Sequence, residues 1–492
     1  MTRDMKRTLS LLITATLVLA ACSPKARNAT QVAARPDIYP DYVGVTIPTG
    51  IAPLDFTVKG TDAIDVVLKA TDGKTLRSGG KTSTKFPIKK WARLLQKSIG
   101  DSVMVSVSAR KNGKWESYEP FGMYVSPDPI DYGLDYRLLE PGYEIYSHMG
   151  IYERELSTFK QRAIIENTQF DGCVNCHSFN HNDPSAMSLH IRGKHGATLL
   201  QFDGKLAAYN TKTDSTLGFC VYPYWHPSGN YIAFSTNSTR QGFHVQPDKI
   251  IEVFDLDSDM QVYDVRNNQI ITAPQIKREG IWESFPAFTP DGRTLYFTAA
   301  KAIAIPGELT QSHYNLMKVS FDPETGTIGN DVELVIDAAS MSKSVCFPKP
   351  SYDGRYLMYT LCDYGTFSIW HHESDLWLLD IQTGETRPID EVNSDDTDSY
   401  HNWSSNSRWF VFSSRRDDGL FTRPYIAHFD ENGVAGKPFM LPQRDPANYY
   451  EDLFRSFNVP EFVTGPVKMN KIRAQKAINA PERVQFGFRW SK

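Results

Sequence analysis

The sequence predicts a mainly β protein whose larger, C-terminal part is a β-propeller. Aromatic residues make up 12% of the 492 residues, and flat rings pack well on pleated sheets. After position 220 a string recurs roughly every 60 residues: an aromatic or Pro/Ser segment, a tight turn, and an alternating apolar strand that ends in an aromatic residue. Each interval holds a second hairpin. Units of four short strands are propeller blades, and we expect five to seven of them.

The repeated strings carry a family resemblance. They begin at Tyr224, Ala287, Lys349 and Asn402, and they turn at Gly229, Gly292, Gly354 and Ser407. They resemble the TolB-like, WD-like propeller repeats of bacterial periplasmic proteins, whose pattern is roughly Trp-Ser-Pro-Asp-Gly followed by a strand. The resemblance covers residues 171–441 and implies a rigid disc with a central channel. It says little about function, because many functions share this fold.

A small β domain is predicted for residues 40–127. Residues 64–69 and 102–109 read as strands, the second with clear alternation. Asp72-Gly73 and Asn112-Gly113 are pairs that favour tight hairpins. We expect a sandwich of the immunoglobulin-like type, with a short helix or a loop anchored by Trp91.

The connecting segments are predicted from their spacing and composition. Residues 128–170 read as a Pro/Asp-rich linker followed by a helix from Met149 to Asn167, in which apolar residues recur at helical spacing. The tail, 442–492, contains a predicted helix at 446–454. We expect it to pack on the propeller.

The N-terminus reads as a processing signal. Residues 1–21 combine a basic start with an apolar run that is too short to span a bilayer. The run ends at Leu19-Ala20-Ala21-Cys22, which resembles a bacterial lipoprotein signal and implies a lipid on Cys22; a plain secretory signal is the alternative. Residues 22–39 would then be a tether. Because no Asp follows Cys22, the resemblance implies the periplasmic side of the outer membrane.

The strongest chemical motif is Cys173-Val-Asn-Cys176-His177. Cys-x-x-Cys-His is the attachment signature of a c-type haem: each thiol forms a thioether with the porphyrin, and the histidine binds the iron. The alternatives are a thioredoxin-like redox pair, which needs a βαβ setting, and half of a zinc site, which needs two more ligands. Export favours covalent haem, because c-type haem is attached outside the cytoplasmic membrane.

The motif aligns with the propeller repeat. Residues 173–179 fill the place of the first strand of a blade, and residues 187–192 fill the next strand. The sequence therefore predicts haem on the first blade, without a separate cytochrome domain. Cys220, Cys346 and Cys362 remain, and the sequence fixes no pairing among them.

The second axial ligand of the iron decides the role of the protein. His190 and Met187 are the first candidates, because both lie on the strand that follows the motif, and alternation allows only one of them to face the haem. His401 and His226, in equivalent places of other blades, come next. For each of these residues, ordinary packing between blades is the alternative.

Two clusters of His, Asp and Glu residues are weaker candidates for metal sites. His371, His372, Glu373 and Asp375 allow a metal site, although a solvated loop is the favoured interpretation. Residues 395–398 are rich in Asp but lack the spacing of a calcium loop. No nucleophile elbow, Walker loop or dinucleotide fingerprint is present. The formal charge of -4 gives no reason to expect nucleic acid as a partner.

The whole chain resembles the haem-bearing, propeller-repeat lipoproteins of Bacteroidetes. We therefore expect a membrane-anchored, periplasmic monohaem c-type cytochrome that transfers single electrons to a protein docked on the propeller face, rather than an enzyme. Two alternatives stay open: a haem enzyme or sensor with an open iron site, and an envelope scaffold that binds protein or glycan and carries haem as a structural part.

Overall fold

The computed structural model describes residues 24–140, 148–170, 172–213, 216–244 and 249–491. The predicted signal peptide and Cys22 lie outside these ranges. The chain forms two compact units, Met1–Pro127 with Pro442–Asp452, and Asp128–Leu441 with Leu453–Lys492. In the described ranges, no helix has the length and apolar character needed to cross a membrane.

The N-terminal unit is mainly β, as predicted. Its main sheet contains β1 (Thr30–Gln31), β8 (Lys114–Ser117), β7 (Ser102–Lys111), β5 (Ala63–Lys69), β6 (Thr75–Gly80), β3 (Thr46–Ile47) and β9 (Phe121–Val125), and β2 (Ile38–Tyr39) pairs with β4 (Thr57–Val58). Helices α2 (Ile88–Gln96) and α3 (Pro446–Asp452) complete the unit. The indole of Trp91 is buried and donates to the carbonyl of Ile51, so Trp91 anchors α2.

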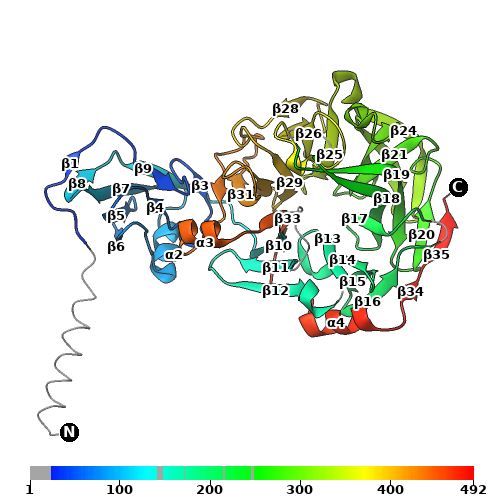
Figure 1. Ribbon diagram of the computed structural model, residues 1–492, viewed down its shortest axis with the longest axis horizontal. Coiled ribbons are helices and arrows are strands. Elements are labelled where there is room, and N and C mark those ends of the chain that lie inside the picture. The colour runs from blue at the N-terminus through cyan, green and yellow to red at the C-terminus, as the bar shows by residue number, and fades with distance from the viewer. Residues whose placement is uncertain (1–23, 141–147, 171, 214–215, 245–248, 492) are drawn as a thin grey trace, which may run out of the picture. The chain divides into compact units, whose positions relative to one another are not determined.

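The described part of the larger unit forms six antiparallel blades, which lies within the predicted range (Figure 1). From the innermost strand outward, blade 1 is β33 (Ser456–Val463), β10 (Gly133–Leu139), β11 (Gly150–Glu155) and β12 (Gln161–Glu166), and blade 2 is β13 (Gly172–Asn180), β14 (Asp183–Gly193), β15 (Ala197–Phe202) and β16 (Lys205–Asn210). Blade 3 is β17 (Cys220–Trp225), β18 (Tyr231–Phe243), β19 (Ile251–Asp264) and β20 (Gln269–Thr272), and blade 4 is β21 (Ile281–Phe288), β22 (Thr294–Lys301), β23 (Asn315–Asp322) and β24 (Thr327–Ile336). Blade 5 is β25 (Ser344–Pro350), β26 (Tyr356–Cys362), β27 (Asp375–Asp380) and β28 (Thr386–Pro388), and blade 6 is β29 (Asp398–Trp403), β30 (Trp409–Ser414), β31 (Arg423–His428) and β32 (Phe439–Met440).

Blade 1 closes the ring by joining distant parts of the chain. Its innermost strand, β33, comes from the C-terminal tail, whereas its other three strands precede the haem motif. The predicted helix over 149–167 is therefore wrong: the segment forms β11, a turn and β12. The apparent helical spacing arose because two strands and their turn were read as one element. The propeller extends beyond the predicted interval of 171–441 at both ends, so the Cys-x-x-Cys-His motif lies on the second blade and the predicted place on the first blade is wrong.

The turns of the repeat explain its glycines. Gly229, Gly292 and Gly354 have φ near +70°, and Ser407 has φ of 58°. A Cβ at Gly292 would collide with the imidazole of His226, so this turn also needs glycine to pack against blade 3. The tail then continues through α4 (Lys471–Asn479), β34 (Val484–Gln485) and β35 (Gly487–Trp490), and the two strands extend blades 2 and 3.

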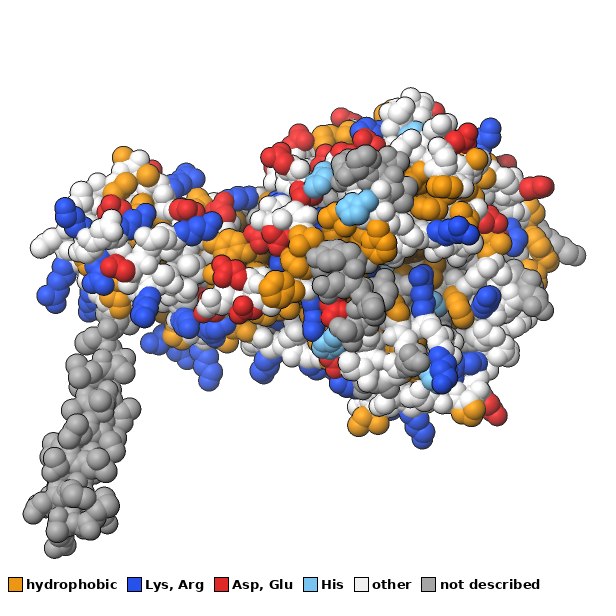
Figure 2. All heavy atoms as spheres, in the orientation of Figure 1, with side chains coloured by type: hydrophobic (Ala, Val, Ile, Leu, Met, Phe, Trp, Pro, Cys, Tyr) orange, Lys and Arg blue, Asp and Glu red, His pale blue; other side chains and the backbone are white. Residues whose placement is uncertain are grey.

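Acidic and basic side chains are interspersed over the visible face of the propeller, with apolar side chains between them (Figure 2). This surface agrees with the small net charge of -4. No large patch of one charge sign is visible among the described residues on this face.

Candidate functional site: a central cavity lined by the Cys-x-x-Cys-His motif

A cavity of about 460 Å³ lies where the innermost strands of the propeller meet. Strands β33, β13, β17, β21, β25 and β29 all contribute to its wall. The volume falls within the range of roughly 300–1,000 Å³ that is typical of small-molecule and cofactor sites.

Each innermost strand has the same irregularity at the cavity. Two consecutive residues bulge opposite a single residue of the next strand. In chain order the pairs are Asn175-Cys176, Tyr222-Pro223, Phe285-Pro286, Phe347-Pro348, Tyr400-His401 and Val459-Pro460. A bulge re-aims side chains without ending the strand, so each blade directs this pair to the centre.

Four of the bulges form an aromatic arc along one side of the cavity. The ring centroids of Tyr222 and Phe285 are 4.6 Å apart, those of Phe285 and Phe347 are 4.3 Å apart, and those of Phe347 and Tyr400 are 4.9 Å apart. All four residues have φ between 49° and 53°, a region that non-glycine residues rarely occupy. Backbone strain repeated at one place suggests that the arc has a function.

The three residues of the motif all line this cavity. Cys173 lies with its sulfur 3.4 Å from the sulfur of Met149, and burial raises the pKa of its thiol. Cys176 occupies the second bulge position of β13. His177 is the next residue along the same strand. One cavity is therefore lined by both cysteines and the histidine of the motif.

His177 is fully buried and lacks a hydrogen bond. Neither of its ring nitrogens has a hydrogen-bond partner among the described residues. Its nearest charged neighbour is Glu461 of β33, whose Oε2 lies 3.7 Å from Nε2. Burial, helped by the charges of Arg137 and Lys349, lowers the pKa of His177 to about 3. The imidazole is therefore neutral, which is the form that binds metals.

Basic side chains also line the cavity, beside its apolar wall. Arg137, Arg192, Lys349 and Arg415 line the cavity, together with the acidic side chain of Glu140. The guanidinium of Arg415 lies 3.3 Å from the centroid of the Trp370 ring, and the ammonium of Lys349 lies 4.9 Å from that of Tyr224. An aromatic pocket with positive side chains suits a flat, largely apolar ligand that carries carboxylates. Haem has these properties, so the residues present fit the group that the motif implies.

The two first candidates for the second axial ligand lie away from the cavity. Met187 belongs to the apolar cluster that includes Ile151 and Val174. His190, on β14, is the single residue that lies opposite the bulge of β13. The centroid of its ring is 5.3 Å from that of the Phe219 ring. Other blades have aromatic residues in the place of His190: Phe234, Phe297, Tyr359, Phe412 and Tyr136. Neither residue is among those that line the cavity.

The two later candidates differ from each other. His226 is held at both nitrogens, by the hydroxyl of Ser228 at 2.8 Å and the carbonyl of Gly292 at 3.0 Å, so it packs blade 3 against blade 4. His401 lines the cavity. Its Nε2 lies 3.0 Å from the carbonyl of Met358, and its Nδ1 has no hydrogen-bond partner in the described structure.

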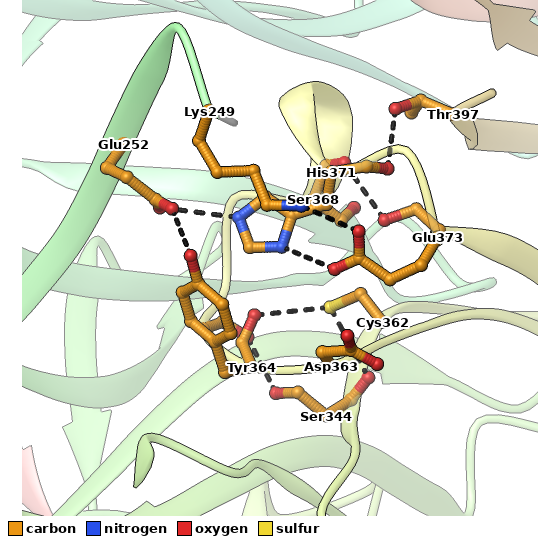
Figure 3. Close-up of polar contacts among 12 residues, drawn as sticks. Lys249, Glu252, Ser344, Cys362, Asp363, Tyr364, Ser368, His371, Glu373 and Thr397 are labelled. Carbon is orange, nitrogen blue, oxygen red and sulfur yellow. Dashed lines mark hydrogen bonds and ion pairs between the residues drawn. The ribbon is translucent and has the colours of Figure 1, made fainter. Parts of the chain in front are cut away.

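Another buried histidine, His371, lies in a cluster of charged side chains outside the cavity wall (Figure 3). His371 lies between two carboxylates, with Nε2 3.3 Å from Glu252 and Nδ1 3.2 Å from Glu373. Glu373 also pairs with Lys249 at 2.7 Å, and the hydroxyl of Tyr364 donates to Glu252 at 2.5 Å. The solvated loop favoured for this segment is therefore wrong at His371, although His372 is exposed. The described residues contain no group of three or more His, Cys, Asp or Glu side chains arranged to hold a metal ion.

The remaining cysteines are all buried. Cys346 and Cys362 lie on adjacent strands of blade 5 with their sulfurs 3.9 Å apart. Cys220 lies alone in blade 3. If two of the three were to pair, the geometry favours Cys346 with Cys362.

The sequence did not reveal the bulge pairs, although they left a signal. An aromatic residue followed by proline stands directly before three of the four repeat strings, and Tyr400-His401 stands before the fourth. Each repeat string begins at the residue after this pair, so the strings themselves do not include the two residues of the pair, which line the cavity.

The fold defines the class: the larger unit is a six-bladed β-propeller. No family model matches the chain, and no curated protein matches it. Among solved structures it is similar to a prolyl endopeptidase, at 10% identity and a TM-score of 0.33, covering 63% of this chain and 42% of that one. The chain thus spans less than half the length of that peptidase. A DUF4784 family protein from Bacteroides caccae matches at 9% identity and a TM-score of 0.30, covering 73% and 95% of the two chains. Porphyromonas gingivalis dipeptidyl peptidase 4 matches at 11% identity and a TM-score of 0.30, covering 85% and 62%.

Proposed function

We propose that this protein is a monohaem c-type cytochrome that holds its haem in the central cavity of the propeller. One observation carries the proposal: Cys173, Cys176 and His177 line a single cavity whose other walls are aromatic and cationic. Neither alternative interpretation of the motif finds its setting here. The motif lies on the innermost strand of an antiparallel blade and not in a βαβ unit, and the described residues offer no zinc ligand set.

The residues divide the task of holding the group. The thiols of Cys173 and Cys176 would each add across a vinyl group of the porphyrin, with the sulfur bonding to one vinyl carbon and the thiol hydrogen going to the other, and His177 would offer its imidazole to the iron. Tyr222, Phe285, Phe347 and Tyr400 supply an apolar wall that excludes water. Arg137 and Arg192 place positive charge at the cavity for the carboxylates of the porphyrin. Bound haem would supply one-electron redox chemistry, which suits transfer to a protein docked at the propeller face.

Covalent haem is tested by expressing the chain with a cytochrome c maturation system. We expect a positive pyridine haemochrome spectrum and an intact mass increased by one haem. The double variant Cys173→Ser/Cys176→Ser should lose both signals, whereas Cys220→Ser, a buried cysteine of blade 3, should keep them. A wild-type chain that matures without covalent haem would contradict the proposal.

The same proposal includes a lipid anchor on Cys22 and a position facing the periplasm, probed separately from haem. In a bacterial host fed labelled palmitate, the wild type should carry label in the membrane fraction, and Cys22→Ser should not. Label on the Cys22→Ser variant, or none on the wild type, would contradict the anchor and leave the haem proposal intact.

A further inference from the structure

We propose that His401 is the second axial ligand of the iron, bound through Nδ1 and oriented by the carbonyl of Met358. This inference rests on the proposed function, because it assigns a second residue to the same haem. It replaces His190 and Met187, the first candidates from sequence, with a residue 224 positions beyond His177 in the chain.

The first support comes from the bulge pairs. At the second position of the pair, four of the six innermost strands have proline: Pro223, Pro286, Pro348 and Pro460. The two departures are Cys176 and His401. Cys176 is a residue of the attachment motif. The second departure, His401, places an imidazole, a common metal ligand, at the equivalent position of β29 in the wall of the same cavity.

The second support is the hydrogen bonding of the ring. A carbonyl oxygen only accepts, so the Nε2 of His401, 3.0 Å from the carbonyl of Met358, must carry the proton. In a neutral imidazole whose Nε2 carries the proton, the other nitrogen, Nδ1, holds the lone pair. That nitrogen is buried and makes no hydrogen bond within the described residues. Histidine ligands usually donate their other N–H to a backbone carbonyl or carboxylate, and Met358 does this here.

The third support is the position of the competing side chains. His190 also has two unpartnered nitrogens, but it fills the place of a packing aromatic residue and does not line the cavity. Among the described histidines, two combine an unpartnered ring nitrogen with a place in the cavity wall: His177 and His401. Blade 1, through β33, lies between the blades that carry them.

Two imidazole ligands would close the iron to small molecules. A six-coordinate, bis-histidine iron is low-spin and has no open position for an exogenous ligand. This arrangement favours an electron carrier over the open-site enzyme or sensor.

The test uses the full chain carrying covalent haem. We expect the wild type to show the low-spin optical and electron paramagnetic resonance signals of two histidine ligands, and no change when carbon monoxide is added to the reduced protein. His401→Ala should become high-spin, bind carbon monoxide and regain a low-spin spectrum on addition of imidazole. His401→Met should stay six-coordinate, with a raised reduction potential and the signature of methionine ligation.

Controls separate this inference from the haem proposal. His190→Gln and Met187→Leu should keep the wild-type spectrum, and circular dichroism should show that each variant is folded. A positive pyridine haemochrome spectrum together with an unchanged low-spin signal in both His401 variants would overturn the inference and spare the proposed function. Loss of the low-spin signal in His190→Gln or Met187→Leu would also overturn it. A negative haemochrome spectrum in the wild type would remove both.

Discussion

Two buried histidines of the propeller unit differ in how their ring nitrogens are paired. His371 lies between Glu252 and Glu373, and each of its nitrogens is within 3.3 Å of a carboxylate (Figure 3). His177 is equally buried, but its nearest carboxylate, that of Glu461, is 3.7 Å away and forms no hydrogen bond with it. Both rings are hidden from water.

The two environments move the pKa values in opposite directions. Burial lowers the pKa of His371, but its bonds to Glu252 and Glu373 outweigh burial and raise it to about 10. Burial dominates at His177 and lowers the pKa to about 3. A charged, paired histidine stabilises a fold, whereas a neutral, unpaired one is available to a ligand. Because native proteins rarely leave buried polar atoms without a partner, such atoms need an explanation. In the central cavity, the proposed haem would provide that explanation.

The largest expected effect comes from breaking the paired cluster. Replacing His371 with Ala leaves the buried carboxylate of Glu252 and the partly exposed carboxylate of Glu373 without their shared partner. We expect the free energy of unfolding to fall by about 3–5 kcal/mol. The neighbouring His372 is a matched control, because its side chain is 55% exposed and pairs with Asp396 at the surface. His372→Ala should cost about 0–1 kcal/mol. Urea unfolding of both variants measures the difference, and equal losses would show that the cluster is not a stabilising network.

The paired cluster should also make stability depend on pH. The pKa of His371 is about 10 in the folded protein, against 6.5 for a histidine side chain outside the fold. Its contribution is therefore fully present below about pH 6.5 and declines as the pH rises toward 10. Between these limits, we expect the difference in unfolding free energy between the wild type and His371→Asn to shrink by about 2–4 kcal/mol.

Measuring the difference between the two proteins removes the titrations of groups that lie outside the cluster. Urea unfolding at pH 6, 8 and 10 gives the profile. A difference that stays constant, or grows with pH, would mean that His371 is not held as a cation.

The sequence revealed the local chemistry of these sites better than their surroundings. Cys173, Cys176 and His177 were found because the motif is contiguous, and the blades were found because each repeats its own turn. The partners of His177 were hidden, since Glu461 lies on the strand that closes blade 1 from the far end of the chain. Alternation along one strand favoured His190, but a bulge breaks alternation, and bulges are set by packing around the whole ring.

The smallest expected change in unfolding free energy is at His177, the unpaired histidine. In protein made without the maturation system, His177 pays the desolvation cost of two polar atoms with no hydrogen bond in return. Replacing it with Leu should therefore leave the free energy of unfolding unchanged or raise it by about 1 kcal/mol. His401→Leu is the counterpart: it removes the bond to Met358 and should cost about 1 kcal/mol. Urea unfolding of the two haem-free variants decides the matter. If His177→Leu is instead destabilised as strongly as His371→Ala, the histidine of the motif serves the fold, and the division between a paired structural cluster and an unpaired ligand site fails.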